Sequence, residues 1–255
     1  MRKTFEFGED SKIVINYDDG DSAGVATIEH VYSKVSAIPK VIIPAEINGC
    51  KVGAIGRRAF SHSLSCKELF LPKGVMLAPE AFRNADIAEV HIPGVREIPY
   101  GCFRNSSLKR LLDCDSVEHV GSGAFADTDQ LAPFEWFSKA TQIPTECFCR
   151  SGITSISNAR VSEISVNAFV YSAIEEIEIT ADCRFHEGCF CCTPISKIVF
   201  TANEDVHFAT EMFKNCRNRV RLVGCRNVVL QTDMDPDNRD DIFDIESRNG
   251  SIIKI

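Results

Sequence analysis

Phenylalanine recurs along this chain at an almost constant interval. The eight positions are Phe60, Phe82, Phe103, Phe125, Phe148, Phe169, Phe190 and Phe213. Successive positions are separated by 22, 21, 22, 23, 21, 21 and 23 residues. A period in this range is typical of a solenoid, in which each repeat forms one coil that stacks on the coil before it. The spacing therefore predicts a repeat architecture and disfavours most enzyme folds.

Two further columns appear when the repeats are aligned on these phenylalanines. An apolar residue stands five positions before each one, at Ile55, Leu77, Ile98, Val120, Ile143, Ile164, Phe185 and Phe208. The residue immediately before each one is small or slim: Ala59, Ala81, Cys102, Ala124, Cys147, Ala168, Cys189 and Met212. Apolar side chains repeated with this regularity predict a shared core that runs through all the coils.

A short alternating pattern follows the phenylalanine in most repeats, as in Leu69-x-Leu71, Val90-x-Ile92 and Ile177-x-Ile179. Alternation with period two is typical of a β-strand that buries one face. Because every coil runs in the same direction, we expect these strands to lie parallel. Each repeat is thus expected to contain a strand, a turn and a compact helical or 3₁₀ segment around the Ala-Phe pair.

The residues from Ile43 to Phe60 carry a more specific pattern. They read IPAEINGCKVGAIGRRAF, and later strands also end in Ile-Pro, as at Ile92-Pro93. This segment resembles the opening of BspA-type leucine-rich repeats, IPxxINGxxVxxIGxxAF. The strands of the fourth and eighth repeats depart from the pattern, and of the family's cysteines three residues after the phenylalanine only Cys216 is present.

The resemblance implies a leucine-rich-repeat solenoid, α/β or mainly β, with a parallel concave sheet and short helical or 3₁₀ segments on the convex side. It also implies that protein partners dock on the strand face, and that surface adhesion is one setting in which such repeats act. The two ends of the chain do not follow the repeat. We expect residues 1–45 to form an N-terminal β cap, residues 46–225 a solenoid of about eight repeats, and residues 226–255 a C-terminal cap that covers the last coil.

The overall charge restricts the classes of partner. The formal net charge of the 255 residues is −8, which disfavours nucleic acid because binding to phosphates needs a basic face. The sequence contains no run of 18 apolar residues that would predict membrane insertion, and its first residues do not resemble a secretory signal. As written, the sequence predicts a cytoplasmic protein, or a secreted or cell-surface protein if a signal peptide was removed. It predicts no oligomeric state.

The twelve cysteines allow buried thiols, disulfides or a metal site. Cys102, Cys147 and Cys189 fall in the small buried column, which favours core thiols. Cys149 and Cys191 share a column but belong to coils two steps apart, too far for a disulfide at the usual strand spacing. The run Cys189-Phe190-Cys191-Cys192 could suggest a zinc site, but Cys189 belongs to the buried column and is expected to point into the core. Buried thiols are therefore the favoured hypothesis, and no cofactor is expected.

Two further patterns in the sequence could indicate chemistry, catalysis by a cysteine and binding of calcium. A catalytic cysteine needs a histidine within hydrogen-bond reach, yet the six histidines are scattered over different repeats, so we predict no enzyme activity. The acidic residues Asp233, Asp235 and Asp237 resemble the start of a calcium loop. No flanking helices are evident, so a solvated acidic loop is the favoured hypothesis and calcium binding the alternative.

The strand residues that face away from the core are the remaining candidates for function. Phe70, His91, Leu112 and Phe137 are expected to form an apolar column on the open face, and Glu89, Arg110 and Glu135 lie beside it. Exposed aromatic anchors are typical of binding hot spots. The first hypothesis is a non-enzymatic module that binds a protein partner through this face. The alternatives are a secreted or surface adhesin, a calcium-dependent module, and a face covered by a cap, a second copy or loops.

Overall fold

The computed structural model describes residues 2–7, 13–20, 24–35, 38–62, 64–134, 136, 139–179, 182–201, 205–209, 211–230, 243–246 and 251–254. The chain divides into two units, residues 1–134 (unit 1) and residues 135–255 (unit 2). Each unit holds four of the eight repeating phenylalanines, and each is described by itself.

In both units the phenylalanines stack from one coil to the next and are fully buried. In unit 1 the ring centroids of Phe60 and Phe82 lie 4.7 Å apart, those of Phe82 and Phe103 4.8 Å, and those of Phe103 and Phe125 5.5 Å. In unit 2 the corresponding rings, from Phe148 to Phe213, are stacked at 5.5 to 6.0 Å. The predicted ladder of buried aromatic rings is therefore present in each unit.

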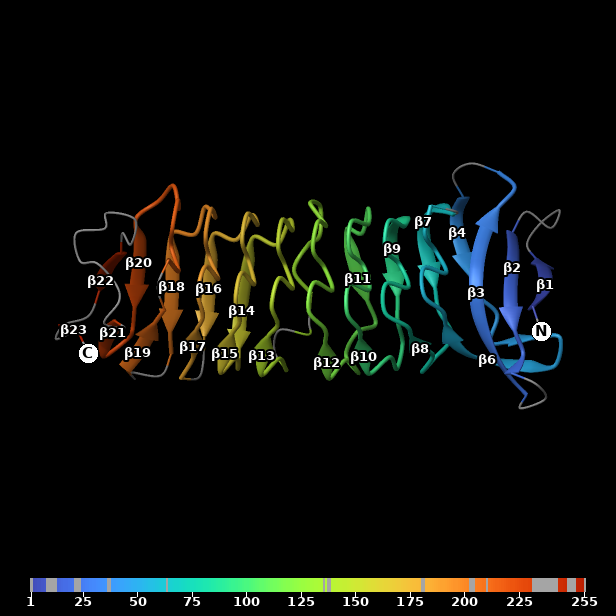
Figure 1. The fold of residues 1–255 in the computed structure, drawn as a ribbon, viewed down its shortest axis with the longest axis horizontal. Helices are drawn as coiled ribbons and strands as arrows, with labels where there is room; N and C mark the ends of the chain where they lie inside the picture. The colour runs from blue at the N-terminus through green and yellow to red at the C-terminus, as the bar shows by residue number, and fades with distance from the viewer. Residues whose placement is uncertain are drawn as a thin grey trace. The chain divides into compact units, whose positions relative to one another are not determined.

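Unit 1 contains twelve strands within its described residues: β1 (Arg2–Phe7), β2 (Ile13–Asp18), β3 (Val25–Ser33), β4 (Ile38–Ile42), β5 (Glu46–Ile47), β6 (Cys50–Ile55), β7 (Ser65–Phe70), β8 (Met76–Leu77), β9 (Asp86–His91), β10 (Glu97–Ile98), β11 (Arg110–Leu112) and β12 (His119–Val120). One parallel sheet has the order β11-β9-β7-β4. On a second side of the coils β3, β6 and β8 pair in parallel, as do β10 and β12 (Figure 1). The strands β1, β2 and β3 pair antiparallel.

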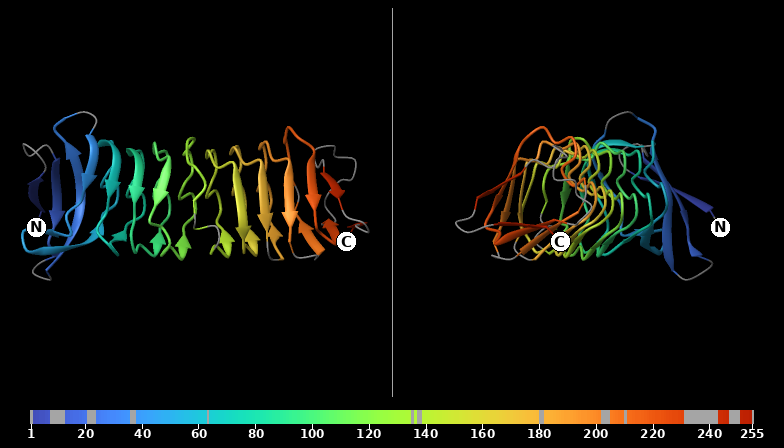
Figure 2. Two further views of the ribbon diagram at one scale, coloured as in Figure 1. Left: turned by 180° about the vertical axis from the view of Figure 1, so that it is seen from behind. Right: turned by 60° about the vertical axis from the view of Figure 1, so that its left-hand side comes forward.

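Unit 2 contains eleven strands within its described residues: β13 (Gln142–Ile143), β14 (Ser155–Ala159), β15 (Glu163–Ile164), β16 (Glu176–Ile179), β17 (Arg184–Phe185), β18 (Lys197–Phe200), β19 (Asp205–Phe208), β20 (Val220–Val223), β21 (Asn227–Leu230), β22 (Phe243–Glu246) and β23 (Ser251–Lys254). They form two parallel sheets, β14-β16-β18-β20-β22 and β13-β15-β17-β19-β21-β23. Figure 2 shows these two rows of strands from behind and at an angle.

The second row of short strands explains the apolar column five residues before each phenylalanine. Every residue of that column ends or nearly ends one of these strands, from Ile55 in β6 to Phe208 in β19. A strand of two residues is too short to show alternation, so the sequence predicted only the first parallel sheet. That sheet is confirmed, and the second sheet is an addition.

The segments around the Ala-Phe pairs differ from the expected helical or 3₁₀ pieces. The described residues contain no α-helix, and these segments are successive turns. The residues two before and two after each phenylalanine all have positive φ, for example Gly123 at 60° and Asp127 at 59° around Phe125. Because two left-handed residues stand four positions apart in each of these segments, an α-helix cannot propagate through them.

The turns are held by two sets of backbone hydrogen bonds. Within a coil, the amide of Arg83 donates to the carbonyl oxygen of Glu80 at 3.0 Å, closing a turn. Between coils, the amide of Phe82 donates to the carbonyl oxygen of Cys102 at 2.8 Å, and the same bond recurs from Phe103 to Ala124. These bonds satisfy the polar backbone groups that surround the buried rings.

A third column closes the core three residues after the phenylalanine. Thr128 donates its hydroxyl to the carbonyl oxygen of Phe125 at 2.6 Å, and Thr193 donates to that of Phe190 at 2.7 Å. Both threonines are buried. Cys216 stands at the same place in its coil and donates its thiol to the carbonyl oxygen of Phe190 at 3.1 Å. Thr128 and Thr193 thus place a hydroxyl group where Cys216 places a thiol.

The cysteines occupy the places that the repeat register assigns to them. Cys102, Cys147 and Cys189 are fully buried beside the phenylalanine ladder. All twelve cysteines are present as thiols. Burial raises the pKa of the Cys66 thiol to about 12, which lowers its reactivity as a nucleophile.

Parallel pairing also extends into the regions expected to be caps. In unit 1, β4 pairs with β7 and β3 with β6. In unit 2, β22 pairs with β20 and β23 with β21. The boundaries proposed for the caps at residues 45 and 226 stay a prediction.

The fourth and eighth repeats, whose strands depart from the sequence pattern, also differ in structure. In the eighth repeat Lys197 pairs with Arg221 and Val199 with Val223, so Arg221 and Val223 are the outward residues of β20. In the fourth repeat, residues 131–134 form no strand. The interval that follows Phe125 and the interval that precedes Phe213 are each 23 residues, the longest in the chain. The added residue changes the register of these two repeats.

The ladder predicts a large loss of stability when one ring is removed. Phe103→Ala is expected to lower the free energy of unfolding by about 3–5 kcal/mol, because Phe103 is stacked on both sides and its removal leaves a cavity. Tyr100→Ala, which removes an exposed side chain, should change it by less than about 0.5 kcal/mol. Urea unfolding followed by circular dichroism measures both, and equal losses would contradict the ladder's role.

The left-handed turns predict that a glycine-to-alanine substitution lowers stability, whereas in a helix it would raise stability. An added Cβ at Gly123 meets nothing nearer than 3.9 Å, so Gly123→Ala tests φ alone. At φ 60° the alanine should destabilise the protein by about 1–2 kcal/mol. In a helix the same substitution would stabilise it by about 1 kcal/mol. Gly123→Asn should cost less than Gly123→Ala, since asparagine tolerates this conformation better.

Candidate functional site

The outward residues of β4, β7, β9 and β11 form two rows across the first sheet of unit 1. We call these eight residues the strand-face site: Lys40, Glu68, Glu89 and Arg110 in the charged row, and Ile42, Phe70, His91 and Leu112 in the second row. The backbone register places each residue beside the next one in its row. Figure 1 shows that these strands follow one another.

Phe70 is held between two neighbours at the centre of the second row. Its ring stacks on the imidazole of His91, with centroids 3.9 Å apart and planes 11° from parallel. The ammonium group of Lys40 lies 4.2 Å from the centroid of the Phe70 ring, a cation–π contact. Phe70 is half-buried, so part of the ring remains open to a partner.

His91 is fixed by carboxylates at both of its ring nitrogens. Nδ1 lies 2.7 Å from Oδ2 of Asp113, and Nε2 lies 3.1 Å from Oε1 of Glu68. Each ring nitrogen thus lies within hydrogen-bond distance of a carboxylate oxygen. The two carboxylates therefore fix the plane of the imidazole and, through the stacking, that of Phe70.

The flanks of the site differ in character. Ile42 has 57% of its surface exposed, although it is a large aliphatic residue in a strand. Leu112 at the other end of the row is half-buried. In the charged row, Nη1 of Arg110 lies 3.4 Å from Oε2 of Glu89. The site thus consists of an apolar and aromatic row beside a row of mixed charge.

The structure brings together five of the seven residues predicted for partner binding. Phe70, His91, Leu112, Glu89 and Arg110 lie on adjacent strands in the predicted register. Glu135 and Phe137 lie outside the described residues, as do the calcium candidates Asp233, Asp235 and Asp237.

Sequence reasoning missed Lys40 and Ile42 of this site, and also the Asp113 carboxylate that contacts His91. Lys40 and Ile42 were assigned to the expected N-terminal cap, although Val41-x-Ile43 followed by Pro44 matches the later strands that end in Ile-Pro. That match was the available signal. Asp113 directly follows the strand, and no sequence pattern predicted its hydrogen bond to His91.

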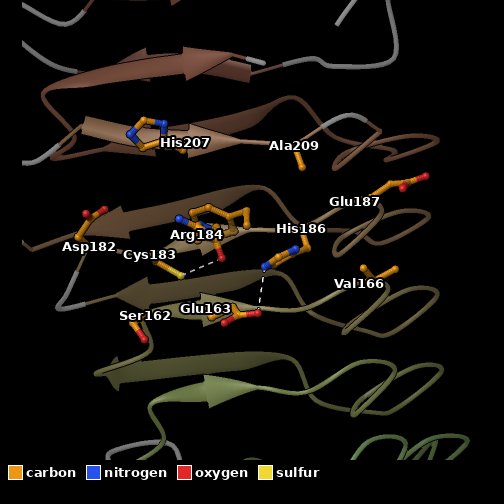
Figure 3. A pocket seen from close by; sticks show the side chains of 11 residues that line it. Ser162, Glu163, Val166, Asp182, Cys183, Arg184, His186, Glu187, His207 and Ala209 are labelled. Carbon is orange, nitrogen blue, oxygen red and sulfur yellow. Dashed lines mark hydrogen bonds and ion pairs between the residues drawn. The ribbon is translucent and has the colours of Figure 1, made fainter. Parts of the chain in front are cut away.

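A groove of about 770 Å³ lies in unit 2, over β15, β17 and β19 (Figure 3). Its lining includes Glu163, Arg184, His186 and His207, with Cys183 and Phe185 at its buried floor. Nε2 of His186 lies 3.0 Å from Oε1 of Glu163. Burial raises the pKa of the Cys183 thiol well above its usual range. Cys183 is therefore disfavoured as a nucleophile that His186 could activate.

A buried carboxylate forms a separate charged cluster in the turns of unit 1. Glu80 has only 4% of its side chain exposed and contacts Arg57, Arg58 and Arg83. Burial by itself raises the pKa of Glu80, but hydrogen bonds from Arg57, Arg83 and Arg58 together outweigh it and hold the pKa at about 2. Glu80 is therefore ionised throughout the neutral range.

Within the described part of the chain, no group of three or more His, Cys, Asp or Glu side chains is arranged to hold a metal ion. No helix in the same residues is long and apolar enough to span a membrane.

Three solved structures are similar to this chain. A leucine-rich repeat protein from Bacteroides ovatus has 15% identity and a TM-score of 0.54, with 98% of this chain and 78% of that chain covered. The T. pallidum leucine-rich repeat protein has 17% identity and a TM-score of 0.40, with 85% and 82% covered. The pneumococcal vaccine antigen PcpA has 9% identity and a TM-score of 0.44, with 99% of both chains covered. The first of these supports the fold and nothing further.

No curated protein sequence matches this chain. The family model for the BspA type leucine-rich repeat region matches residues 26–154 and 118–229, with six copies of the repeat. Together these matches span residues 26–229, well over half of the chain. With this match and the mainly β solenoid described above, the chain belongs to the BspA-type leucine-rich repeat family.

Proposed function

We propose that this protein is a non-enzymatic interaction module that binds a protein partner through the strand-face site. One observation carries the proposal: an apolar and aromatic row, from Ile42 to Leu112, crosses four adjacent parallel strands and stays partly open to solvent. Membership of a leucine-rich repeat family supports an interaction module in general.

The order of the aromatic centre supports the proposal further. A partner that packs on Phe70 meets a ring already fixed by Lys40 and His91. Fixing a side chain before binding reduces the entropy lost when the complex forms. Ordered aromatic side chains near the centre of an interface are also where most binding free energy is concentrated.

The charged row supplies a polar border to this centre. Lys40 and Arg110 at its two ends are basic, whereas Glu68 and Glu89 between them are acidic. The row is therefore neither wholly positive nor wholly negative. Such borders contribute orientation and association rate more than affinity. We therefore propose a partner that places apolar side chains over Phe70 and Ile42 and paired charges over Glu68 to Arg110.

The remaining parts of the sequence-based hypothesis stay predictions. These are the absence of catalysis, the cytoplasmic compartment and the alternative of a secreted or surface adhesin. Each concerns the setting of the module, and the strand-face site would serve any of these settings.

Loss of the central ring should remove partner binding. Peptides selected from a phage-displayed random library on the full chain are expected to bind Phe70→Ala at least about tenfold more weakly, since central aromatic residues commonly contribute 2 kcal/mol or more. Biolayer interferometry with the selected peptides measures this. His91→Ala should weaken binding less, because it removes the support of the ring and leaves the ring itself.

A matched control is available in Met76. Met76 is 68% exposed and lies in β8, which pairs with β6 and is not part of the sheet that carries the strand-face site. Met76→Ala should therefore bind the selected peptides as the parent does. Circular dichroism of each variant establishes that it is folded. Selected peptides that bind Phe70→Ala and the parent equally well would place the interaction elsewhere.

A further inference from the structure

Three arginines surround the carboxylate of Glu80 in the turns of unit 1. Arg57 approaches Oε2 with Nε at 2.9 Å and Nη2 at 2.8 Å, in a two-point contact. Arg58 donates from Nε to the same oxygen at 3.1 Å, and Arg83 donates from Nη1 to Oε1. We call these four residues the arginine cluster.

The cluster carries an excess of two positive charges. Three guanidinium groups face one carboxylate, although the chain as a whole has a net charge of −8. The carboxylate is buried, whereas the side chains of Arg57, Arg58 and Arg83 are 67%, 53% and 34% exposed. Each guanidinium has five N–H donors, so most of those in the cluster remain available to a second anion.

Arg58 and Glu80 both stand two residues before a phenylalanine, with φ of 56° and 60°. Gly101, Gly123 and Gly188 hold the same place in three other coils, and Glu146 and Glu211 hold it in two more. The turns therefore place Arg58 and Glu80 at equivalent positions of neighbouring coils, where their side chains meet at 3.1 Å.

We propose that Arg57, Arg58 and Arg83 form a binding site for a phosphate dianion, with Glu80 as the residue that positions them. Arginine matches the oxygens of phosphate with two-point hydrogen bonds, and the excess of two charges equals the charge of the dianion. Glu80 holds the three guanidinium groups close together despite their mutual repulsion, so little order is lost on binding. The site lies in the turns and is independent of the strand-face site.

The role of Glu80 predicts a dependence of stability on pH. The pKa of Glu80 is about 2 in the folded protein, against 4.5 for a glutamate in the unfolded chain. Its contribution to the free energy of unfolding is therefore present above pH 4.5 and is lost as the pH falls towards 2. Glu80→Gln should therefore lower the urea midpoint at pH 7 and lower it much less at pH 2.5. Glu97→Gln is the control, because it makes the same change at an exposed glutamate in β10. A Glu80→Gln deficit of equal size at both pH values would contradict the role.

Phosphate binding is tested on the full chain by titration with inorganic phosphate at pH 7.5. Calorimetry gives the affinity, and the arginine Nε–Hε resonances in ¹H–¹⁵N NMR spectra show which side chains respond. Arg58→Gln is expected to weaken binding about tenfold, since a hydrogen bond between charged groups is roughly twice as strong as a neutral one. Arg96→Gln removes an exposed arginine of unit 1 whose Nη1 is 3.9 Å from Glu118, and it should change nothing.

Titration with phenyl phosphate distinguishes a phosphate ester from the free phosphate ion as the ligand. Phenyl phosphate that binds more tightly than inorganic phosphate assigns the site to phosphate esters, and equal affinity assigns it to the free ion. If Arg58→Gln fails to fold by circular dichroism, Arg57→Gln replaces it, because Arg57 is the most exposed of the three. A response no greater than that to sodium chloride of equal ionic strength, or equal phosphate affinity in the folded arginine variant and the parent, overturns the proposal.

Discussion

The stack of buried phenylalanines is the contact on which every other part of the coil depends. Each ring packs on the ring of the neighbouring coil, at 4.7 Å between Phe60 and Phe82. The flanking residues must turn the chain sharply to bring the next ring into line. They do so with two left-handed residues per coil, one on each side of the phenylalanine. The distance between the rings in turn brings the strands of successive coils into hydrogen-bonding register, because all of these elements share one step per coil.

The parts of the structure that repeat were the parts that the sequence could predict. The period located the ladder, and the alternation at Leu69 and Val90 located the first sheet. The helical expectation was wrong because amino-acid type only partly marks the left-handed positions. Glycine, asparagine or aspartate stands at Gly101, Asn105, Gly123 and Asp127, but arginine, glutamate and tyrosine stand at equivalent places. A propensity argument gives no reason to expect Tyr171 or Glu146 at positive φ.

The strand-face site was predictable to the extent that it follows from the alternation of strands. Once Leu69 faces inward, Phe70 must face outward, and the parallel register places it beside His91. The ion pairs could not be predicted in this way. Asp113 reaches His91 from a residue beyond the end of β11, at φ 55°, so its direction depends on a turn that no periodic pattern describes. Lys40 was missed because its strand precedes the first phenylalanine.

The coil thus divides its positions into two kinds, and this division bears on where new function can arise. Outward strand residues contribute little to the ladder, so a wide range of side chains is compatible with the fold there. Left-handed turn residues are constrained by the backbone, and glycine is the least strained choice. Glu80 at such a position is buried and surrounded by three arginines, whereas Glu211 at the equivalent place of its coil is exposed. Departures of this kind are where a sequence that is otherwise consistent with its fold is expected to carry a function.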